Sequence, residues 1–366
     1  MFSLPFLIMA GALLVLLLFN GLLFARLAFR DRAVKENRDL PVSVVICARN
    51  ASEDLRELVP LIMDQDHREF QLVVVNDRSD DDTWEVLQWM ADTEPRLLPV
   101  NIQADEKFSY GKKIALGVGL RSAEHPFVLL TDADCRPVSR DWISCMASGF
   151  HDERRIVLGY SPYEEGQGVA NVLERFDGVS KAVQYLSFAL AGLPYMGVGR
   201  NLGYASELFF NTKGSKSHRH LMSGDDDLFI NEVARARNTS IVADPRAFMT
   251  TRASADLGTW WRRKRRHYTT ARYYRPFHQF LLILLPLARS VFWAALAVLL
   301  WRGHWEEALI GLLVKVMLYT PVQMMAMHRL GAGPLVRWAL PLEWVFLLLD
   351  PAIYLSTLLI KPRRWK

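Results

Sequence analysis

The chain has 366 residues, of which 51% are hydrophobic and 23% are charged, and its formal net charge is +5. This composition suits a globular protein of one or two domains, and three cysteines without a C-x-x-C pair argue against a disulfide framework or a paired-cysteine metal site. The positive charge gathers beside apolar segments, so we expect anionic lipid or a phosphorylated substrate as partner, and no nucleic acid.

The N-terminal part predicts a transmembrane helix within residues 1–30. The run from Leu4 to Phe24 has no charged residue and is long enough, at about 1.5 Å per residue, to cross a hydrocarbon core of about 30 Å. A basic cluster follows it: Arg26, Arg30, Arg32, Lys35 and Arg38. A signal peptide would instead begin with basic residues, so we expect a membrane helix whose following segment is cytoplasmic.

Short β-branched runs alternate with helical stretches in the first half of a soluble domain at residues 40–275. The predicted strands are 42–47, 70–76, 97–102 and 127–132, and the predicted helices are 52–64, 81–92 and 111–123, with Ser52 as an N-cap. This order predicts an α/β fold with a mostly parallel sheet and helices on both faces. Ligands of such sheets bind beyond the carboxyl ends of the strands.

Polar residues follow three of these strands. They are Ala48-Arg49-Asn50, Asn76-Asp77-Arg78-Ser79 and Thr131-Asp132-Ala133-Asp134. Two carboxylates spaced as Asp132 and Asp134 can bind Mg2+ or Mn2+ together with water and a substrate phosphate. The first aspartate can equally cap backbone amides in a turn, and for an isolated pair the turn is the commoner role.

The second half of the domain is less regular. Residues 192–214 are rich in glycine and aromatic residues, which suits a loop that closes on a substrate. The triplet Asp225-Asp226-Asp227 can form the acidic first turn of a helix, stabilised by the helix dipole. Residues 260–275 form a basic, aromatic-rich stretch that suits a membrane surface.

The C-terminal region, residues 277–366, contains about three further membrane segments, at 280–301, 308–327 and 335–360. They include Arg289, Lys315, Glu343 and Asp350, which we expect to pair within the bundle or snorkel rather than to act in function. If all three cross, the basic tail KPRRWK lies outside, against the positive-inside rule. The alternative is a last segment that is re-entrant or interfacial, broken near Asp350-Pro351.

Six motifs in this order resemble the inverting family 2 glycosyltransferases, which have the GT-A fold. They are PVSVVICARN, VVVNDRSDDDT, FSYGKKIAL, LLTDADC, SGDDDLF and WWRRKRRHY, and they cover roughly residues 40–275. Each motif is weak by itself, and the resemblance depends on their order and spacing.

The resemblance implies a role for each matching residue. Ala48, Arg49, Asn50 and Glu53 would line the nucleoside pocket, Asp77 would hold the nucleotide base, and Lys112 or Lys113 would lie near the diphosphate. Asp132 and Asp134 would be the D-x-D pair, with Asp134 as the direct metal ligand. Asp226 would be the general base that deprotonates the acceptor hydroxyl. Arg263 and Arg266, in an R-x-x-R-H motif that replaces Q-x-x-R-W, would grip the nucleotide diphosphate or the acceptor.

We therefore expect a multi-pass enzyme of the cell (inner or plasma) membrane with a cytoplasmic catalytic domain. It would transfer a sugar with inversion from a nucleotide-sugar, a UDP-sugar being favoured, to a lipid or lipid-linked acceptor, with Mg2+ or Mn2+. A processive polysaccharide synthase is an alternative, against which the altered R-x-x-R-H motif argues. A non-catalytic membrane scaffold or a nucleotidyltransferase on the same fold is the other.

Overall fold

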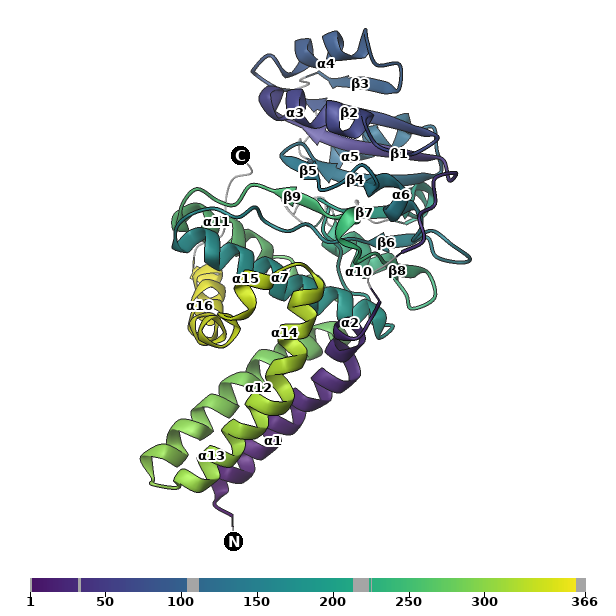
Figure 1. Cartoon of the computed structure of the whole chain (residues 1–366). Helices are drawn as coiled ribbons and strands as arrows, with labels where there is room; N and C mark the ends of the chain where they lie inside the picture. The colour runs from purple at the N-terminus through teal and green to yellow at the C-terminus, as the bar shows by residue number, and fades with distance from the viewer. Residues whose placement is uncertain (1, 32–33, 104–111, 213–223, 225, 360–366) are drawn as a thin grey trace.

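The protein is described here by a computed structural model, which covers residues 2–31, 34–103, 112–212, 224 and 226–359. An α/β domain lies at one end of the molecule, and a bundle of long helices extends from it (Figure 1). The N-terminal helix α1 (Leu4–Phe19) packs in this bundle against α12 (Pro276–Trp301), although most of the chain separates the two in sequence. The α/β domain is thus inserted between membrane segments.

The α/β domain contains a mixed sheet that has seven strands in the described part of the chain, in the order β3-β2-β1-β4-β7-β6-β8. The strands are β1 Val42–Ala48, β2 Phe70–Asp77, β3 Leu97–Ile102, β4 Phe127–Asp132, β6 Ile156–Leu158, β7 Leu202–Ala205 and β8 Thr239–Ile241. β1 pairs in parallel with β2 and β4, and β2 pairs in parallel with β3. The mostly parallel sheet is therefore confirmed, with each of its first four strands within one residue of the predicted bounds.

Helices cover both faces of this sheet because the parallel strands are apolar on both sides. Val45 and Val73 belong to the apolar cluster on one face, whereas Val44 and Leu72 belong to the cluster on the other. The helices of the domain are α3 Ser52–Met63, α4 Thr83–Ala91, α5 Lys112–Ser122, α6 Trp142–Ala147, α7 Val169–Leu190, α8 Ser206–Asn211, α10 Asp227–Val233 and α11 Leu257–Tyr268. The helices α3 and α4 pack on the second cluster, while α5 and α7 pack on the first.

The expectation of a closing loop at residues 192–214 is wrong for its central part. Leu202–Ala205 forms β7, which lies antiparallel between β4 and β6, and α8 follows directly. Gly203 is required by close packing, because a Cβ atom there would lie 2.9 Å from Leu129 and from Phe150. Glycine in this stretch therefore allows side chains to pack over the sheet. Residues 213 and 214 lie outside the described residues.

The prediction that Ser52 caps α3 is also wrong. Ala51 occupies the cap position, without a capping bond from its side chain, and Ser52 is the first helical residue. The free N–H groups of this first turn are bound instead by the first residue of α4 and by the loop before it. The Ala51 N–H donates to Thr83 Oγ1 at 3.0 Å, and the Ser52 N–H donates to Asp81 Oδ2 at 3.4 Å. A tertiary contact thus replaces the local cap.

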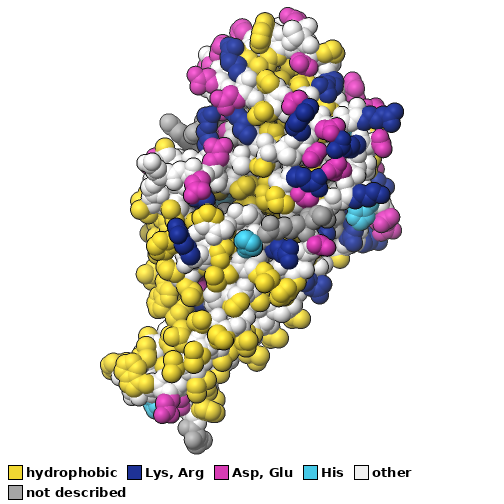
Figure 2. Space-filling model, in the orientation of Figure 1, with side chains coloured by type: hydrophobic (Ala, Val, Ile, Leu, Met, Phe, Trp, Pro, Cys, Tyr) yellow, Lys and Arg dark blue, Asp and Glu magenta, His cyan; other side chains and the backbone are white. Residues whose placement is uncertain are grey.

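Four helices in the described residues are long and apolar enough to cross a membrane: Leu4–Ala28, Pro276–Trp301, Trp305–Arg329 and Ala339–Thr357. The first of them combines α1, η1 (Asn20–Phe24) and α2 (Ala25–Ala28). The third combines α13 (Trp305–Val314), η4 (Lys315–Tyr319) and α14 (Thr320–Arg329). The fourth lies in α16 (Ala339–Leu359), which follows the short helix α15 (Gly333–Val336). Apolar side chains dominate the visible surface of the bundle, and charged ones gather on the α/β domain (Figure 2). One N-terminal and three C-terminal helices therefore have the length and apolar composition that the predicted membrane segments require.

The charged residues of the C-terminal segments have protein partners. Lys315 Nζ lies 3.0 Å from a carboxylate oxygen of Glu343, and Lys315 is fully buried. Arg289 donates to the Tyr319 hydroxyl at 2.8 Å. The carboxylate of Asp350 lies 2.6 Å from Lys264 Nζ, which belongs to α11. The expectation of pairing within the protein is therefore correct for these charges.

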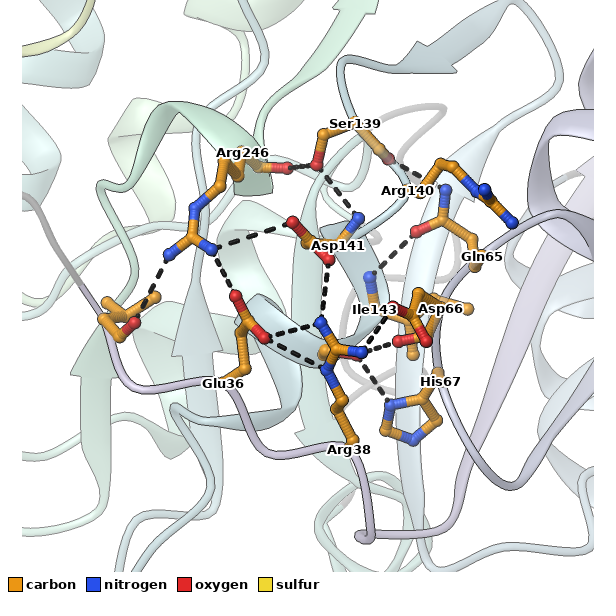
Figure 3. Close-up of polar contacts among 12 residues, drawn as sticks. Glu36, Arg38, Gln65, Asp66, His67, Ser139, Arg140, Asp141, Ile143 and Arg246 are labelled. Carbon is orange, nitrogen blue, oxygen red and sulfur yellow. Dashed lines mark hydrogen bonds and ion pairs between the residues drawn. The ribbon is translucent and has the colours of Figure 1, made fainter.

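The segment between α2 and β1 is fixed to the α/β domain by a network of charged side chains (Figure 3). Arg38 Nη2 lies 2.8 Å from Glu36 and 3.4 Å from Asp141, and Arg38 also contacts Asp66. Arg246 of the domain pairs with Glu36 as well. One exposed pair contributes at most about 1 kcal/mol, so the network as a whole holds the linker. The first membrane helix consequently joins the domain at a defined place.

Candidate active site

The three predicted strand ends meet at one rim of the sheet. In the parallel register, Ala48 of β1 lies beside Asn76 of β2, and Cys47 of β1 lies beside Asp132 of β4. Asp77 ends β2 and Asp132 ends β4, so both carboxylates leave the sheet at the same edge. The rule that parallel strands present their carboxyl ends together thus accounts for how these residues are gathered.

The loops after β1 and β2 are joined by hydrogen bonds. The Asn50 N–H donates to Ser79 Oγ at 2.9 Å, and the Asp80 N–H donates to Asn50 Oδ1 at 2.8 Å. Asn50 has a φ of 49°, a left-handed conformation that asparagine adopts more readily than most residues. Arg49 lies nearby, with Nη2 3.9 Å from Asp80. The two loops therefore form one rigid wall of the predicted nucleoside pocket.

Asp77 is buried and its two carboxylate oxygens differ. Arg78 donates to Oδ1 from Nε at 2.9 Å and from Nη2 at 2.7 Å. Oδ2 is buried, and no hydrogen-bond partner for it occurs among the described residues. A buried acceptor that lacks a partner requires an explanation, and an N–H group of a ligand is one.

The first aspartate of the D-x-D pair forms a close ion pair. Lys112, in the first turn of α5, places Nζ 2.6 Å from Asp132 Oδ1. Burial alone would raise the pKa of Asp132, but Lys112 and, at longer range, Arg200 and Arg266 hold this pKa below its ordinary value. Asp132 therefore carries its negative charge with one oxygen already engaged. Lys113 follows in the same turn and is half-buried.

The electrostatic surroundings of the second aspartate, Asp134, differ from those of Asp132. Its pKa is raised by the surrounding protein and by the neighbouring Asp132 charge, although Arg200 and Arg263 oppose this. The side chain is open to solvent, between β4 and the short strand β5 (Cys135–Pro137), which pairs with β9 (Met249–Thr251). A bound cation would offset the repulsion between the two carboxylates, so the site is suited to a cation.

The oxygen donors at this place fit a hard divalent cation. The described residues contain no group of three or more His, Cys, Asp or Glu side chains arranged around a metal position. A cation here would be held by Asp134 and Asp132, with water and donor phosphate oxygens completing the coordination shell, as is usual for Mg2+. Because Lys112 engages Asp132 Oδ1, the open carboxylate of Asp134 is the better direct ligand.

Tyr163 aligns two arginines beside the D-x-D pair. Its ring lies 4.6 Å from the guanidinium carbon of Arg200 and 5.8 Å from that of Arg263, and its hydroxyl accepts a hydrogen bond from Arg200 at 2.9 Å. Arg263 also donates to Glu174 at 2.9 Å. The two guanidinium groups are thus held in place next to Asp134, where they can bind the oxygens of a diphosphate.

Arg266 and His267 complete the cationic side of the site. The positive charge of Arg266 helps to lower the pKa of Asp132. The pKa of His267 is lowered to about 3 by the surrounding protein and by Arg266, Arg200 and Arg263, even though the side chain is open to solvent. The R-x-x-R-H motif therefore contributes two cations and one neutral imidazole.

Asp226 is connected to this cationic group by residues 199–200. Its Oδ2 accepts the Gly199 N–H at 2.7 Å, and its Oδ1 accepts the Asp227 N–H at 2.8 Å. Arg200, the neighbour of Gly199, is the residue whose charge acts on both D-x-D aspartates. The same two residues thus link the predicted base to the predicted metal pair. Asp225 lies outside the described residues.

The other acidic residues of the prediction have different surroundings. Asp227 is buried at the start of α10, where its Oδ2 accepts hydrogen bonds from Thr270 at 2.5 Å and from Tyr274 at 2.7 Å. It therefore anchors the segment that follows α11. Glu53 lies exposed in the first turn of α3, and Ala48 is buried at the end of β1.

Sequence reasoning missed Arg200, Tyr163 and Lys264. Lys264 is buried, with Nζ 2.8 Å from Asp177 of α7 and 2.6 Å from Asp350 of α16. Burial would lower its pKa, but these two carboxylates raise it above the ordinary value. Arg200 and Tyr163 stand in irregular segments without a repeating pattern, whereas the position of Lys264 within the basic motif was a signal that could have been followed.

Comparison with known proteins identifies the domain. Residues 43–189 match the family model described as Glycosyl transferase family 2. The matched range extends from β1 through nearly all of α7 and includes the D-x-D pair, while Asp226 and α11 lie beyond it. No curated protein sequence matches the chain.

The chain is similar to several solved structures at low identity, and one of them shares the fold with a TM-score above 0.5. The mannosyltransferase PcManGT from Pyrobaculum calidifontis, in complex with GDP-Man and Mn2+, has a TM-score of 0.57 and 18% identity, covering 91% of this chain and 98% of its own. S. aureus TarS 1–349 has a TM-score of 0.42 and 17% identity, covering 89% and 93%. Mannosyl-3-phosphoglycerate synthase from Rubrobacter xylanophilus has a TM-score of 0.39 and 18% identity, covering 66% and 76%. The family match identifies residues 43–189 as a glycosyltransferase family 2 domain, and the likeness to PcManGT shows that the two proteins share the GT-A fold.

Proposed function

We propose that this enzyme transfers a sugar, with inversion, from a nucleoside-diphosphate sugar to a lipid or lipid-linked acceptor at the cytoplasmic membrane face. The observation that supports the proposal is the shared sheet edge at which Asp77 and Asp132 end their strands, to which Asp226 is linked through the Gly199 N–H group. Lys112, Arg200 and Arg263 supply positive charge around the aspartates. Such a site suits a substrate whose negative charge is a diphosphate and whose leaving group must be stabilised.

Asp132 and Asp134 would hold Mg2+ or Mn2+. When bound, the cation would neutralise charge on the departing nucleoside diphosphate. The PcManGT structure contains Mn2+ and GDP-Man, which supports a divalent cation with a nucleotide-sugar in this fold. Arg200 and Arg263 would bind the remaining diphosphate oxygens, because their guanidinium planes are already fixed by Tyr163.

Asp226 would act as the general base. Backbone N–H groups fix the orientation of the carboxylate by donating to both of its oxygens. One of them would accept the proton of the acceptor hydroxyl as the acceptor oxygen bonds to the anomeric carbon and the bond to the diphosphate oxygen breaks. A single displacement without an enzyme nucleophile inverts the anomeric configuration.

The environment of Asp77 supports a uracil or thymine base over guanine. Guanine presents two adjacent donors, N1–H and the 2-amino group, which match both oxygens of one carboxylate. Uracil and thymine present one donor, N3–H. Since Arg78 engages Asp77 Oδ1 twice, the buried Oδ2 is the oxygen that fits a single donor. We therefore propose a UDP-sugar as the donor.

The position of the site beside the membrane supports a lipid acceptor. The helix α7 packs on the first membrane segment, where the rings of Phe188 and Phe19 lie 6.4 Å apart. The helix α11 carries Arg263 on its catalytic side and contacts membrane segment α16 through Lys264. An acceptor with a hydroxyl or phosphate at the leaflet surface can therefore reach a base in this domain without leaving the membrane.

The test is transfer from radiolabelled UDP-, dTDP- and GDP-sugars in membranes that contain the enzyme, with and without Mn2+. The proposal expects one UDP-sugar to label a product that extracts into organic solvent, and expects Asp77→Asn to weaken UDP binding more than it weakens UDP-independent Mn2+ binding. A water-soluble product would overturn the lipid acceptor. Preference for a GDP-sugar would overturn the assignment of the base.

A further inference from the structure

We infer that α16 does not cross the membrane but lies in the leaflet on the side of the catalytic domain, with an apolar stripe against the lipids. By length and composition α16 could cross, although it is the least apolar of the four candidate segments in the described residues. Its contacts at both ends lead to a different conclusion.

The chain that leads into α16 is on the side of the catalytic domain. The preceding membrane segment ends at Arg329, whose Nε donates to the carbonyl oxygen of Ala28 at 3.0 Å. Ala28 ends the first membrane segment just before the linker to β1. Gly331, two residues after Arg329, lies against Phe248 of the catalytic domain. The chain has therefore returned to this side at Gly331, before α16 starts at Ala339.

The end of α16 is on the same side. Arg265 of α11 donates to the carbonyl oxygen of Ser356 at 2.9 Å, and the rings of Tyr268 and Tyr354 lie 6.2 Å apart. Since α11 belongs to the catalytic domain and is held there by Glu174 and Asp177, the last two turns of α16 cannot be on the far side of a bilayer. A helix of about 30 Å that the chain enters from this side and that also ends on this side does not cross the bilayer. Figure 1 shows α16 nearly end-on, whereas α1 and α12 run lengthwise.

The side chains of α16 divide into two stripes, as an in-plane helix requires. One stripe faces the protein: Glu343, Phe346, Asp350 and Ile353. Glu343 pairs with Lys315, Asp350 pairs with Lys264, and Ile353 is fully buried. The other stripe, Trp344, Leu348, Leu355 and Leu359, is exposed, with Leu348 at 74% and Leu359 at 85%.

The partner of the exposed stripe is the lipid of this leaflet. The apolar surface of the bundle continues onto α16, because Trp344 packs on Trp293 of α12 at a ring distance of 4.2 Å. A second protein chain would need to cover this stripe and the adjoining bundle surface together, whereas a bilayer that surrounds the bundle covers both. The positive-inside rule favours the same orientation, because the sequence after α16, KPRRWK, is basic.

Two measurements on the full-length protein in sealed membrane vesicles test this inference. The first uses an impermeant maleimide on a cysteine appended after Lys366, with His304→Cys, in the loop between α12 and α13, as the control for the far side. The unmodified protein, whose three cysteines are Cys47, Cys135 and Cys145, is the blank. We expect the appended cysteine to react from the opposite side to His304→Cys. Reaction from the same side would overturn the inference.

The second measurement compares membrane depth at two places eleven residues apart, by spin labels on Leu348→Cys and Leu359→Cys. For an in-plane helix the two depths agree, whereas a helix that crosses upright would separate them by about 16 Å. Leu287→Cys and Val298→Cys, exposed and also eleven residues apart on α12, are the matched crossing control. A depth difference on α16 equal to that on α12 would overturn the inference, and it would do so independently of any enzymatic activity.

Discussion

Replacement of Asp226 by asparagine separates proton transfer from donor binding. Both carboxylate oxygens accept backbone N–H groups, from Gly199 at 2.7 Å and from Asp227 at 2.8 Å. An asparagine side chain has one carbonyl oxygen and one amino group, so it can accept only one of these two N–H groups. The variant should therefore lose about 1–3 kcal/mol of stability, the usual cost of a polar group left without its partner.

The catalytic effect should exceed this structural effect. Loss of a general base typically lowers the rate by about 10²–10⁴-fold, and an amide cannot replace the carboxylate as proton acceptor. The donor is expected to bind through the D-x-D pair and its cation, whereas the Asp226 carboxylate accepts the N–H groups of Gly199 and Asp227. Donor affinity in the presence of Mn2+ should therefore stay at the wild-type value.

The assay is single-turnover transfer at saturating donor and acceptor, with donor affinity measured by calorimetry in detergent. Asp227→Asn is the matched control, since it makes the same change one position along the chain, in a carboxylate that binds Thr270 and Tyr274. The control should lower thermal stability while folded protein keeps its turnover. If Asp226→Asn retained turnover within tenfold of wild type, Asp226 would not be the base.

Three further changes have definite expected results. Asp134→Ala should abolish the Mn2+ dependence of donor binding in calorimetry, and an unchanged dependence would exclude Asp134 as a metal ligand. Lys264→Met leaves the carboxylates of Asp177 and Asp350 without their cation, so the protein should lose about 3 kcal/mol and unfold at lower temperature, whereas Lys264→Arg should keep most of its stability. Because the pKa of His267 is lowered to about 3, the unfolded chain binds a proton near pH 6.5 that the folded protein excludes. Wild type should therefore lose more stability than His267→Gln as the pH falls from about 6.5 towards 3, and parallel pH profiles of unfolding would contradict this.

The sequence alone predicts the four parallel strands and the edge of the sheet at which their carboxyl ends meet. Short β-branched runs such as 70–76 favour strands buried on both faces, because buried helices are usually longer. Once the strands are parallel, Asp77 and Asp132 must leave the sheet at one edge. The D-x-D site followed from topology and did not require any knowledge of side-chain contacts.

Other features depend on contacts between distant segments. Arg200 becomes part of the site because Tyr163 and Gly199 are brought beside the D-x-D pair, and no local pattern around Arg200 indicates this. Residues 202–205 read as a loop because glycine is usually found in loops, yet Gly203 serves close packing on β4. The hydropathy of α16 likewise indicates that the helix could cross a membrane. Its direction, however, is set by its contacts with α11.

The helix α11 connects the membrane to the catalytic site through its own periodicity. Residues three or four apart share a face of a helix, so Trp260, Lys264 and Tyr268 lie on one side and Arg263 and Arg266 on another. The first side contacts α16, where the Lys264 ammonium group lies 4.3 Å from the ring of Phe346 and Tyr268 donates to Asp350 at 2.9 Å. The second side carries the cations that act on the D-x-D aspartates. A rotation of α11 that broke the contacts with α16 would also move Arg263 away from Tyr163. The geometry of the predicted diphosphate site and the position of α16 therefore both depend on the orientation of α11.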